Sequence, residues 1–274
     1  MRRRTVVVFG ALLLSLVMAL PALAITKGGT LDGEDHPYVG LMVADDADGN
    51  PLWRCSGSMI SPRVFVTAGH CTESPAAGAT IWFESDVESG IPENGYPAGG
   101  ATSHDGTAYT HPFYDPDAFF LFDLGVVVLD EPVELDRYAD LPEVGAIDEL
   151  DRGRKRSTVT AVGYGLQNAN KNHTVADRIR MQADLFVVNT QGVAGIGNLK
   201  LPGDLPPTNS VILSGDAKHG GTCFGDSGGP GLLGGTDTIV AVNSFGLNGN
   251  CAGIGGMFRI DRQLEIDWIE SFLG

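Results

Sequence analysis

The chain of 274 residues carries 34 aspartates and glutamates against 18 lysines and arginines, a formal net charge of −16 at pH 7. This acidic balance argues against nucleic acid and anionic membranes as partners, because both are themselves negatively charged. The length is ample for a large hydrophobic core in one or two domains. Charge and length leave the substrate open.

The first 24 residues have the composition of an export signal. Three arginines at positions 2–4 precede an apolar run from Thr5 to Leu20, and the segment ends in Pro21-Ala22-Leu23-Ala24. A basic start, an apolar centre and a small-x-small ending predict a signal peptide at 1–24, cleaved after Ala24. The alternative is an anchoring transmembrane helix, since the run approaches the ~20 residues that span a bilayer. We expect a secreted protein, extracellular or periplasmic.

Four cysteines in an exported chain predict two disulfides. Counting alone allows three pairings. Local pairing of Cys55 with Cys71 and of Cys223 with Cys251 would tie each bond to its own half of the chain. The alternative is a structural zinc site, but the sequence lacks the close Cys-x-x-Cys spacing that such sites usually have.

From Ile25 onward the chain alternates between short apolar runs and stretches of Gly, Asp, Asn and Pro. The runs have strand length and are rich in valine, isoleucine or aromatic residues. They are Tyr38–Val43, Val64–Thr67, Gly125–Leu129, Thr158–Val162, Leu185–Val188, Val211–Leu213 and Thr238–Val242. This pattern predicts an all-β fold of two barrels, because closing a sheet removes its exposed edges.

Two polar stretches separate these runs. Residues 45–50, Asp-Asp-Ala-Asp-Gly-Asn, predict a hairpin turn. They resemble part of a calcium loop, but no glutamate follows at the EF-hand spacing. Residues 136–157 are charge-dense and contain proline, which predicts a connection between two β halves.

Helical periodicity is clear only at the C-terminus. Leu264, Trp268 and Phe272 recur four residues apart, and acidic residues occupy the other faces. This spacing predicts one amphipathic helix that packs its Trp268 face on the body of the protein.

Residues 221–230, Gly-Thr-Cys-Phe-Gly-Asp-Ser-Gly-Gly-Pro, contain the candidate nucleophile Ser227. A serine hydroxyl becomes a good nucleophile only beside a base. The glycines allow a turn that presents Ser227 to a cleft and points the N–H groups of Gly225 and Ser227 at one spot. Such paired donors stabilise an oxyanion, at about 3–4 kcal/mol per donor removed. The alternative is a glycine-rich hairpin with an incidental serine.

The candidate base is His70, one of six histidines. It stands in Val66-Thr67-Ala68-Gly69-His70-Cys71, directly after a predicted strand and beside a cysteine. The disulfide and the strand would fix the backbone and leave the ring at the end of the strand.

The base needs a carboxylate to hold its tautomer, and Asp123 is the candidate. It opens the apolar run Leu124–Leu129, a boundary where a carboxylate is expensive to bury unless it accepts strong hydrogen bonds. The rivals are Asp115, Asp117 and Asp130.

Three strings together resemble the chymotrypsin-like (trypsin-like) serine endopeptidases. They are Gly-Asp-Ser-Gly-Gly-Pro at 225–230, Thr-Ala-Gly-His-Cys at 67–71 and Asp-Leu-Gly at 123–125. The order His70, Asp123, Ser227 is that of this family. The α/β-hydrolases share Gly-x-Ser-x-Gly, but their histidine follows the serine, and none follows Ser227 here.

The resemblance implies two antiparallel six-stranded β-barrels. Residues 25–145 would form the barrel with His70 and Asp123, and residues 146–258 the barrel with Ser227. Residues 259–274 would hold the C-terminal helix. In the family, a peptide binds in the cleft between the barrels.

The resemblance also implies a specificity pocket. Trypsin-like members have an aspartate six residues before the serine, where this chain has Gly221. Thr222, Ser244, Gly246 and Gly255 would complete an uncharged pocket for an apolar or aromatic side chain. Ser244-Phe245-Gly246 resembles the family's strand that pairs with the substrate backbone.

The family's activation mechanism points to Ile25 and Asp226. A free N-terminal isoleucine in this family inserts into the second barrel, where its ammonium pairs with the aspartate before the serine. Cleavage after Ala24 would expose Ile25, twelve residues before Pro37, a spacing that resembles the family's mature start. Lys27 departs from the family pattern, which has glycine there.

The sequence therefore predicts a secreted serine endopeptidase acting on proteins or peptides. We expect no cofactor, no metal, no nucleic-acid partner, no membrane association after signal cleavage, and a monomer. The alternative is a catalytically inactive binding protein on the same scaffold. Asn172-His173-Thr174 fits a glycosylation acceptor, which matters only in a eukaryotic secretory pathway.

Overall fold

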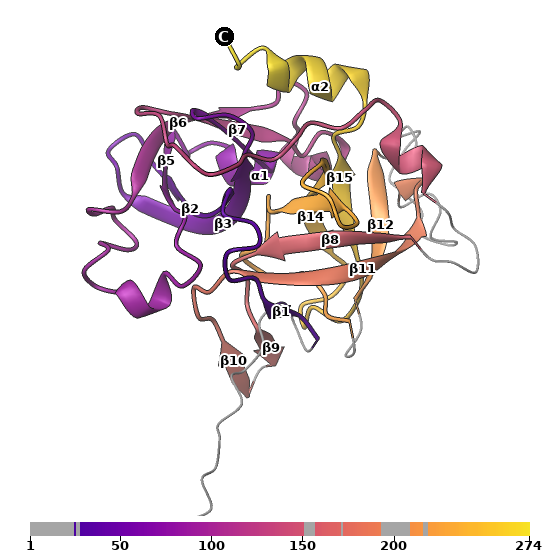
Figure 1. Cartoon of the computed structure of the whole chain (residues 1–274), viewed down its shortest axis with the longest axis horizontal. Coiled ribbons are helices and arrows are strands. Elements are labelled where there is room, and N and C mark those ends of the chain that lie inside the picture. The colour runs from indigo at the N-terminus through magenta and orange to yellow at the C-terminus, as the bar shows by residue number, and fades with distance from the viewer. Residues whose placement is uncertain (1–24, 26–27, 151–156, 171, 193–208, 216–218) are drawn as a thin grey trace, which may run out of the picture.

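The computed structural model describes residue 25 and residues 28–150, 157–170, 172–192, 209–215 and 219–274. The predicted signal peptide and residues 151–156 of the predicted connection lie outside these residues. Figure 1 shows two β-barrels side by side, with the C-terminal helix at one end of the molecule. Within the described residues, no helix is both long and apolar enough to cross a membrane.

The first barrel is a closed ring of six antiparallel strands in the order β2-β3-β4-β7-β6-β5. Their bounds are β2 Val39–Asp45, β3 Pro51–Met59, β4 Val64–Thr67, β5 Gly78–Trp82, β6 His104–Thr110 and β7 Gly125–Leu129. Residues 45–50 form the predicted turn between β2 and β3. The Asp46 carboxylate accepts the N–H groups of Asp48 and Asn50 at 2.9 Å, which closes the turn.

The second barrel contains β8 Thr158–Gly163, β11 Met181–Asn189, β12 Ser210–Gly215, β13 Pro230–Leu233, β14 Ile239–Gly246 and β15 Gly253–Arg259. These strands follow the order β11-β12-β15-β14-β13-β8, and pairing of β8 with β11 closes the ring. The short strand β1 Thr30–Leu31 adds to β11. A hairpin of β9 Asn168–Asn170 and β10 His173–Val175 projects from this barrel (Figure 1).

The helical elements are short and lie between or after the strands. Helix α1 Gly69–Thr72 follows β4, and α2 Gln263–Glu270 ends the fold. Three 3₁₀ helices, η1 Glu88–Gly90, η2 Pro116–Leu121 and η3 Ala146–Glu149, lie in connections. The two six-stranded barrels and the C-terminal helix are the architecture that the sequence predicts.

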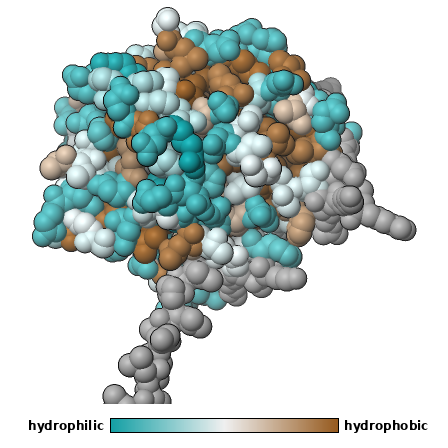
Figure 2. Space-filling view, viewed as in Figure 1, coloured by the Kyte–Doolittle hydropathy of each residue, from teal (hydrophilic) through white to brown (hydrophobic). Residues whose placement is uncertain are grey.

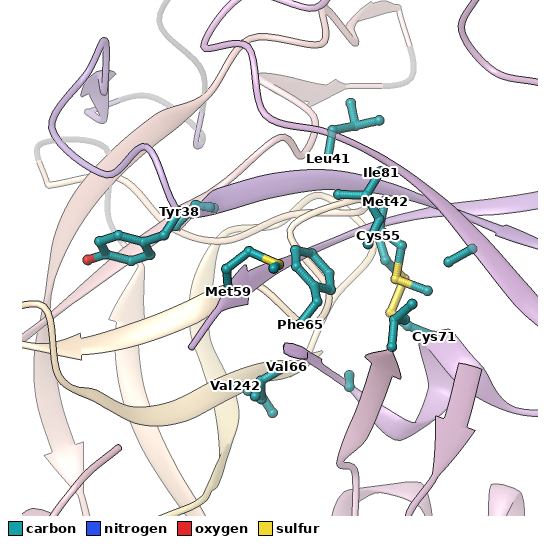
Figure 3. Close-up of a cluster of buried hydrophobic side chains, with 14 of the residues drawn as sticks. Tyr38, Leu41, Met42, Cys55, Met59, Phe65, Val66, Cys71, Ile81 and Val242 are labelled. Carbon is teal, nitrogen blue, oxygen red and sulfur yellow. A yellow bond between two sulfur atoms is a disulfide. The ribbon is translucent and has the colours of Figure 1, made fainter. Parts of the chain in front are cut away.

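The hydrophobic core is shared between the barrels. One buried cluster, part of which Figure 3 draws, combines Met59 and Phe65 of the first barrel with Val242 and Phe258 of the second. A second cluster lies inside the second barrel and includes Ile25, whose side chain is fully buried. The cluster that spans both barrels holds the two halves of the cleft in a fixed relation, because tightly packed interiors resist deformation.

The C-terminal helix is confirmed, but the face predicted for it is partly wrong. Leu264 is 48% exposed, whereas Ile266 and Ile269 are buried and Trp268 is half-buried. Glu265 is fully buried and accepts the side-chain N–H of Asn209 at 3.3 Å. The helix therefore packs the face that contains Ile266 and Ile269 against the barrels, and Leu264 of the predicted face points toward solvent. Figure 2 shows an apolar area on the surface near this helix.

Candidate active site

The position of His70 follows from the end of β4 and the start of α1. Strand β4 ends at Thr67, and the helix places His70 in its first turn. The next residue, Cys71, is bonded to Cys55 of β3, so the disulfide ties α1 to the barrel wall. Gly69 allows the close packing of this turn, because a Cβ there would lie 2.7 Å from Tyr114 Cδ2.

Asp123 is fully buried and accepts three different donors. The backbone N–H of His70 donates to Oδ1 at 2.9 Å, and Nδ1 of the same ring lies 2.9 Å from Oδ2. The Ser244 hydroxyl donates to Oδ2 at 2.6 Å. A carboxylate on Nδ1 favours the tautomer that carries its proton there, which makes Nε2 a proton acceptor.

The surroundings of His70 raise its pKa above the ordinary 6.5. Burial lowers the pKa, but the charge and the hydrogen bond of Asp123 raise it by more, and Glu73 raises it further. The ring is 24% exposed and lies at the edge of the cleft. It is therefore a basic imidazole with access to a ligand.

The Ser227 loop is pinned to strand β3 of the other barrel. The Ser56 N–H donates to the Ser227 carbonyl at 2.8 Å, and the Ser56 hydroxyl donates to the Gly225 carbonyl at 2.8 Å. Gly225 has φ +97°, a value that favours glycine. Among the described residues, neither the Gly225 nor the Ser227 N–H donates a hydrogen bond. These two donors are therefore available to a ligand.

His70 and Ser227 line one open cavity of about 680 Å³ between the barrels. A neighbouring space of about 20 Å³ opens beside Gly221 and Gly255. Its described lining is uncharged and includes Leu185, Leu213 and Met257. Thr222 and Gly246 line both spaces, whereas Ser244 lines only the larger one. The structure thus places Ser244 with the Asp123 carboxylate rather than in the narrow pocket.

Asp226, the residue before Ser227, is a buried carboxylate held by backbone donors. The N–H groups of Gly165 and Cys223 donate to its two oxygens at 2.7 and 2.8 Å. Burial raises the pKa of Asp226 to about 6, although these hydrogen bonds and the charge of Arg54 oppose the increase. Gly163 and Gly165 make room for it, since a Cβ on either would lie within 2.5 Å of a carboxylate oxygen.

The structure contains both locally paired disulfides, Cys55–Cys71 and Cys223–Cys251. Within the described residues, Cys55, His70 and Cys71 form a group with metal-ligand spacing. Both sulfur atoms of this group are in the disulfide, so they are not thiolate ligands.

Three contacts of the site had not been predicted. Ser56 pins the nucleophile loop, Ser244 bonds Asp123, and the Tyr114 hydroxyl donates to Glu73 Oε2 at 2.9 Å on the cleft wall. Ser56 follows Cys55 directly, and this is the only local signal that could have marked it. Nothing near Glu73 or Tyr114 in the sequence indicates that they meet, since they are 41 residues apart.

Comparison with known proteins gives relatives along most of the chain. A trypsin from Saccharopolyspora erythraea is 28% identical over 227 residues, covering 81% of this chain and 86% of the relative. Human granzyme M is 28% identical over 245 residues, with 84% of each chain covered. A chymotrypsin from Phaedon cochleariae is 25% identical, covering 77% of this chain and 69% of the relative.

Solved structures have the same fold. The structure of HL collagenase superposes with a TM-score of 0.69 at 21% identity, covering 91% of this chain and 98% of the other. Human heparin binding protein superposes with a TM-score of 0.62 at 21% identity, covering 90% and 96%. The family model described as Trypsin matches residues 29–269. The chain therefore belongs to the trypsin family of serine proteases.

Proposed function

We propose that this protein is a secreted serine endopeptidase in which His70, Asp123 and Ser227 act as a catalytic triad. The observation that carries the proposal is the pairing of the His70 ring with the buried Asp123, at the edge of the cavity that Ser227 also lines. Family membership supports the reaction class, and the two disulfides support an oxidising, extracellular location.

The mechanism begins with His70 removing the proton from the Ser227 hydroxyl as the oxygen attacks the peptide carbonyl. The carbonyl oxygen becomes an oxyanion, which the N–H groups of Gly225 and Ser227 stabilise. Asp123 stabilises the imidazolium that forms. His70 then protonates the leaving amine, and water hydrolyses the acyl-enzyme by the same steps in reverse.

We propose an apolar primary specificity. The uncharged lining beside Gly221 supports it, because a buried lysine or arginine would find no carboxylate there among the described residues. The space of about 20 Å³ holds little more than one water, so the walls must move apart for a large side chain. Matched peptide substrates with Leu, Phe, Lys or Arg before the cleaved bond test this, and an arginine preference would contradict it.

We further propose that signal cleavage after Ala24 activates the protein by freeing the α-amino group of Ile25 to pair with Asp226. Burial of the Ile25 side chain in the second barrel and the buried Asp226 carboxylate support this. Ile25 has φ +46°, which is strained for a β-branched residue. Cleavage removes that strain, because an N-terminal residue has no φ constraint. N-terminal sequencing of active protein should give Ile25.

A fluorophosphonate probe tests the central proposal, because it reacts with a serine only when a neighbouring base activates it. We expect stoichiometric labelling of Ser227, identified by peptide mass spectrometry, and none in Ser227→Ala. The His70→Ala variant should fold and show labelling slowed by at least about a thousandfold. Folded wild-type protein that resists the probe would favour an inactive binding protein, since a scabies mite inactivated protease paralogue also has this fold.

A further inference from the structure

A carboxylate lies on the wall of the cleft beside His70. Helix α1 ends at Thr72, and the next residue, Glu73, is half-buried and lines the same cavity as His70 and Ser227. Its charge acts on the imidazole, since Glu73 contributes to the raised pKa of His70. Glu73 therefore belongs to the surface that a substrate covers.

Tyr114 holds this carboxylate in place. The hydroxyl donates to Oε2 at 2.9 Å, and the tyrosine ring packs against the backbone of Gly69. Burial and the bond to Glu73 both raise the pKa of Tyr114, so the hydroxyl stays a neutral donor. One donor satisfies only part of a carboxylate, which has about four acceptor positions. The second oxygen, Oε1, is left for a ligand.

No lysine or arginine offsets the charge of Glu73 within the described part of the chain. The described lining of the large cavity contains no lysine or arginine, and Glu73 is its one carboxylate. None of the ion pairs among the described residues includes Glu73. A partly buried carboxylate without a counter-ion is a binding position for a cation.

The arrangement of the cleft indicates which substrate residue would lie beside Glu73. Strand β13 pairs with one edge of β14 only as far as Val242, while β14 continues to Gly246 along the large cavity. An extended peptide can pair with β14 beyond the end of β13. Successive side chains of an extended peptide on this stretch point to opposite sides. A peptide with one side chain in the narrow pocket beside Gly221 would turn the preceding side chain toward the opposite wall, which His70 and Glu73 line.

We propose that Glu73, held by Tyr114, selects lysine or arginine at the substrate residue immediately before the one that enters the narrow pocket. This specificity rests on the proposed endopeptidase function. The lysine or arginine side chain would form an ion pair with Oε1 at the edge of the cleft, in partly screened surroundings. The protein would then prefer a basic residue followed by an apolar one.

The test compares peptidyl coumarin amides with leucine before the scissile bond and either lysine or norleucine in the preceding position. Norleucine keeps the aliphatic chain of lysine and removes its charge. We expect kcat/KM, normalised to the Ser227 labelled by the fluorophosphonate, to be about fivefold higher for lysine. The ratio should fall toward one in 0.5 M NaCl, because salt screens a partly exposed ion pair.

Two variants separate the local contact from the general acidity of the protein. Glu73→Gln keeps an oxygen for the Tyr114 hydroxyl and should bring the lysine-to-norleucine ratio to about one. Any effect of this substitution on His70 changes kcat/KM for both substrates alike and therefore cancels in the ratio. Glu131→Gln removes an equal charge at a side chain that is 88% exposed, and should leave the ratio unchanged.

The experiment distinguishes a failure of the role proposed for Glu73 from a failure of the proposed endopeptidase function. Labelled protein with equal rates for lysine and norleucine would overturn the role of Glu73 alone. An equal fall of the ratio in both variants would also overturn it, since net charge would then be the cause. Absence of Ser227 labelling would overturn the endopeptidase proposal and this inference with it.

Discussion

At the scale of single residues, the two buried carboxylates of the candidate active site, Asp123 and Asp226, have different hydrogen-bond partners. Asp123 accepts hydrogen bonds from the His70 ring, the Ser244 hydroxyl and the His70 backbone N–H. Asp226 accepts two backbone N–H groups, and burial leaves its pKa raised to about 6. Asp226 is therefore a carboxylate whose ionisation costs the folded chain stability, until a cation reaches it.

We expect a pH-dependent stability difference between the wild-type chain and Asp226→Asn when residues before Ile25 are retained. The folded pKa of about 6 exceeds the ordinary 3.8, so the contribution is fully present below pH 3.8 and is lost as pH rises through 6. The free energy of unfolding of the wild type, relative to the variant, should fall by about 3 kcal/mol across this window. Urea denaturation at pH 4, 5, 6 and 7 measures it.

The same comparison in a chain that begins at Ile25 probes the proposed activation pair. An ammonium beside Asp226 stabilises the ionised carboxylate and lowers its pKa. The loss of stability with rising pH should then shrink or reverse. An unchanged loss in the shorter chain would argue against the ion pair, and a flat difference in both chains would contradict the raised pKa.

At the scale of elements, the nucleophile loop depends on contact between β3, β4 and the second barrel. Gly228 has φ +77°, and a Cβ there would lie 2.0 Å from Thr67 Oγ1 and 2.6 Å from the Ser56 carbonyl oxygen. The loop approaches the first barrel so closely that only hydrogen fits. The position of Ser227 relative to His70 is therefore set by backbone contact between the two halves.

Gly228→Ala should reduce stability by about 3 kcal/mol or more, because it adds an overpacked contact to the cost of a left-handed conformation. The matched control is Gly235→Ala, which has φ +75° and nothing within 4 Å of the added Cβ. The control should cost only about 1–2 kcal/mol, the cost of the left-handed conformation alone. Urea denaturation measures both, and similar losses in the two variants would show that the close approach is not what matters.

At the scale of the whole molecule, a buried ion pair joins the N-terminal segment to both barrels. Arg180 and Asp32 are fully buried and pair at 2.8 Å. The same guanidinium donates to the carbonyl oxygens of Val39 and Phe83 and to the Tyr164 hydroxyl. The segment that follows strand β1, the first barrel and the second barrel thus all contact the side chain of Arg180.

Arg180→Met should destabilise the protein by about 3–5 kcal/mol, because it removes the guanidinium from the buried Asp32 and leaves His36 as the one described side chain that still contacts this carboxylate. The control is Arg178→Met, whose pair with Glu88 is partly exposed, with side chains 30% and 36% accessible. That loss should be about 1 kcal/mol or less. Thermal and urea unfolding compare the two. If Arg180→Met with Asp32→Asn is no more stable than Arg180→Met alone, the uncompensated charge is not the cause.

The local features of this fold could be predicted from the sequence. The strands Val64–Thr67 and Gly125–Leu129 have the predicted bounds, and the Asp46 turn and the two-barrel architecture were also expected. Strands and turns depend on patterns of apolar and turn-forming residues that extend over only a few positions, so they can be recognised in the sequence. The motifs around His70, Asp123 and Ser227 were also recognisable because each is short and contiguous.

What only the tertiary structure decided are contacts between distant segments. The structure contains one of the three possible disulfide pairings. The Ser244 hydroxyl bonds Asp123, 121 residues away, and the Ser56 hydroxyl bonds the carbonyl of Gly225 in the nucleophile loop, 169 residues away. The tertiary structure buried Glu265 where spacing favoured Leu264, and set Glu73 beside Tyr114. These choices depend on how two closed barrels pack, and packing joins residues whose separation along the chain leaves no local pattern.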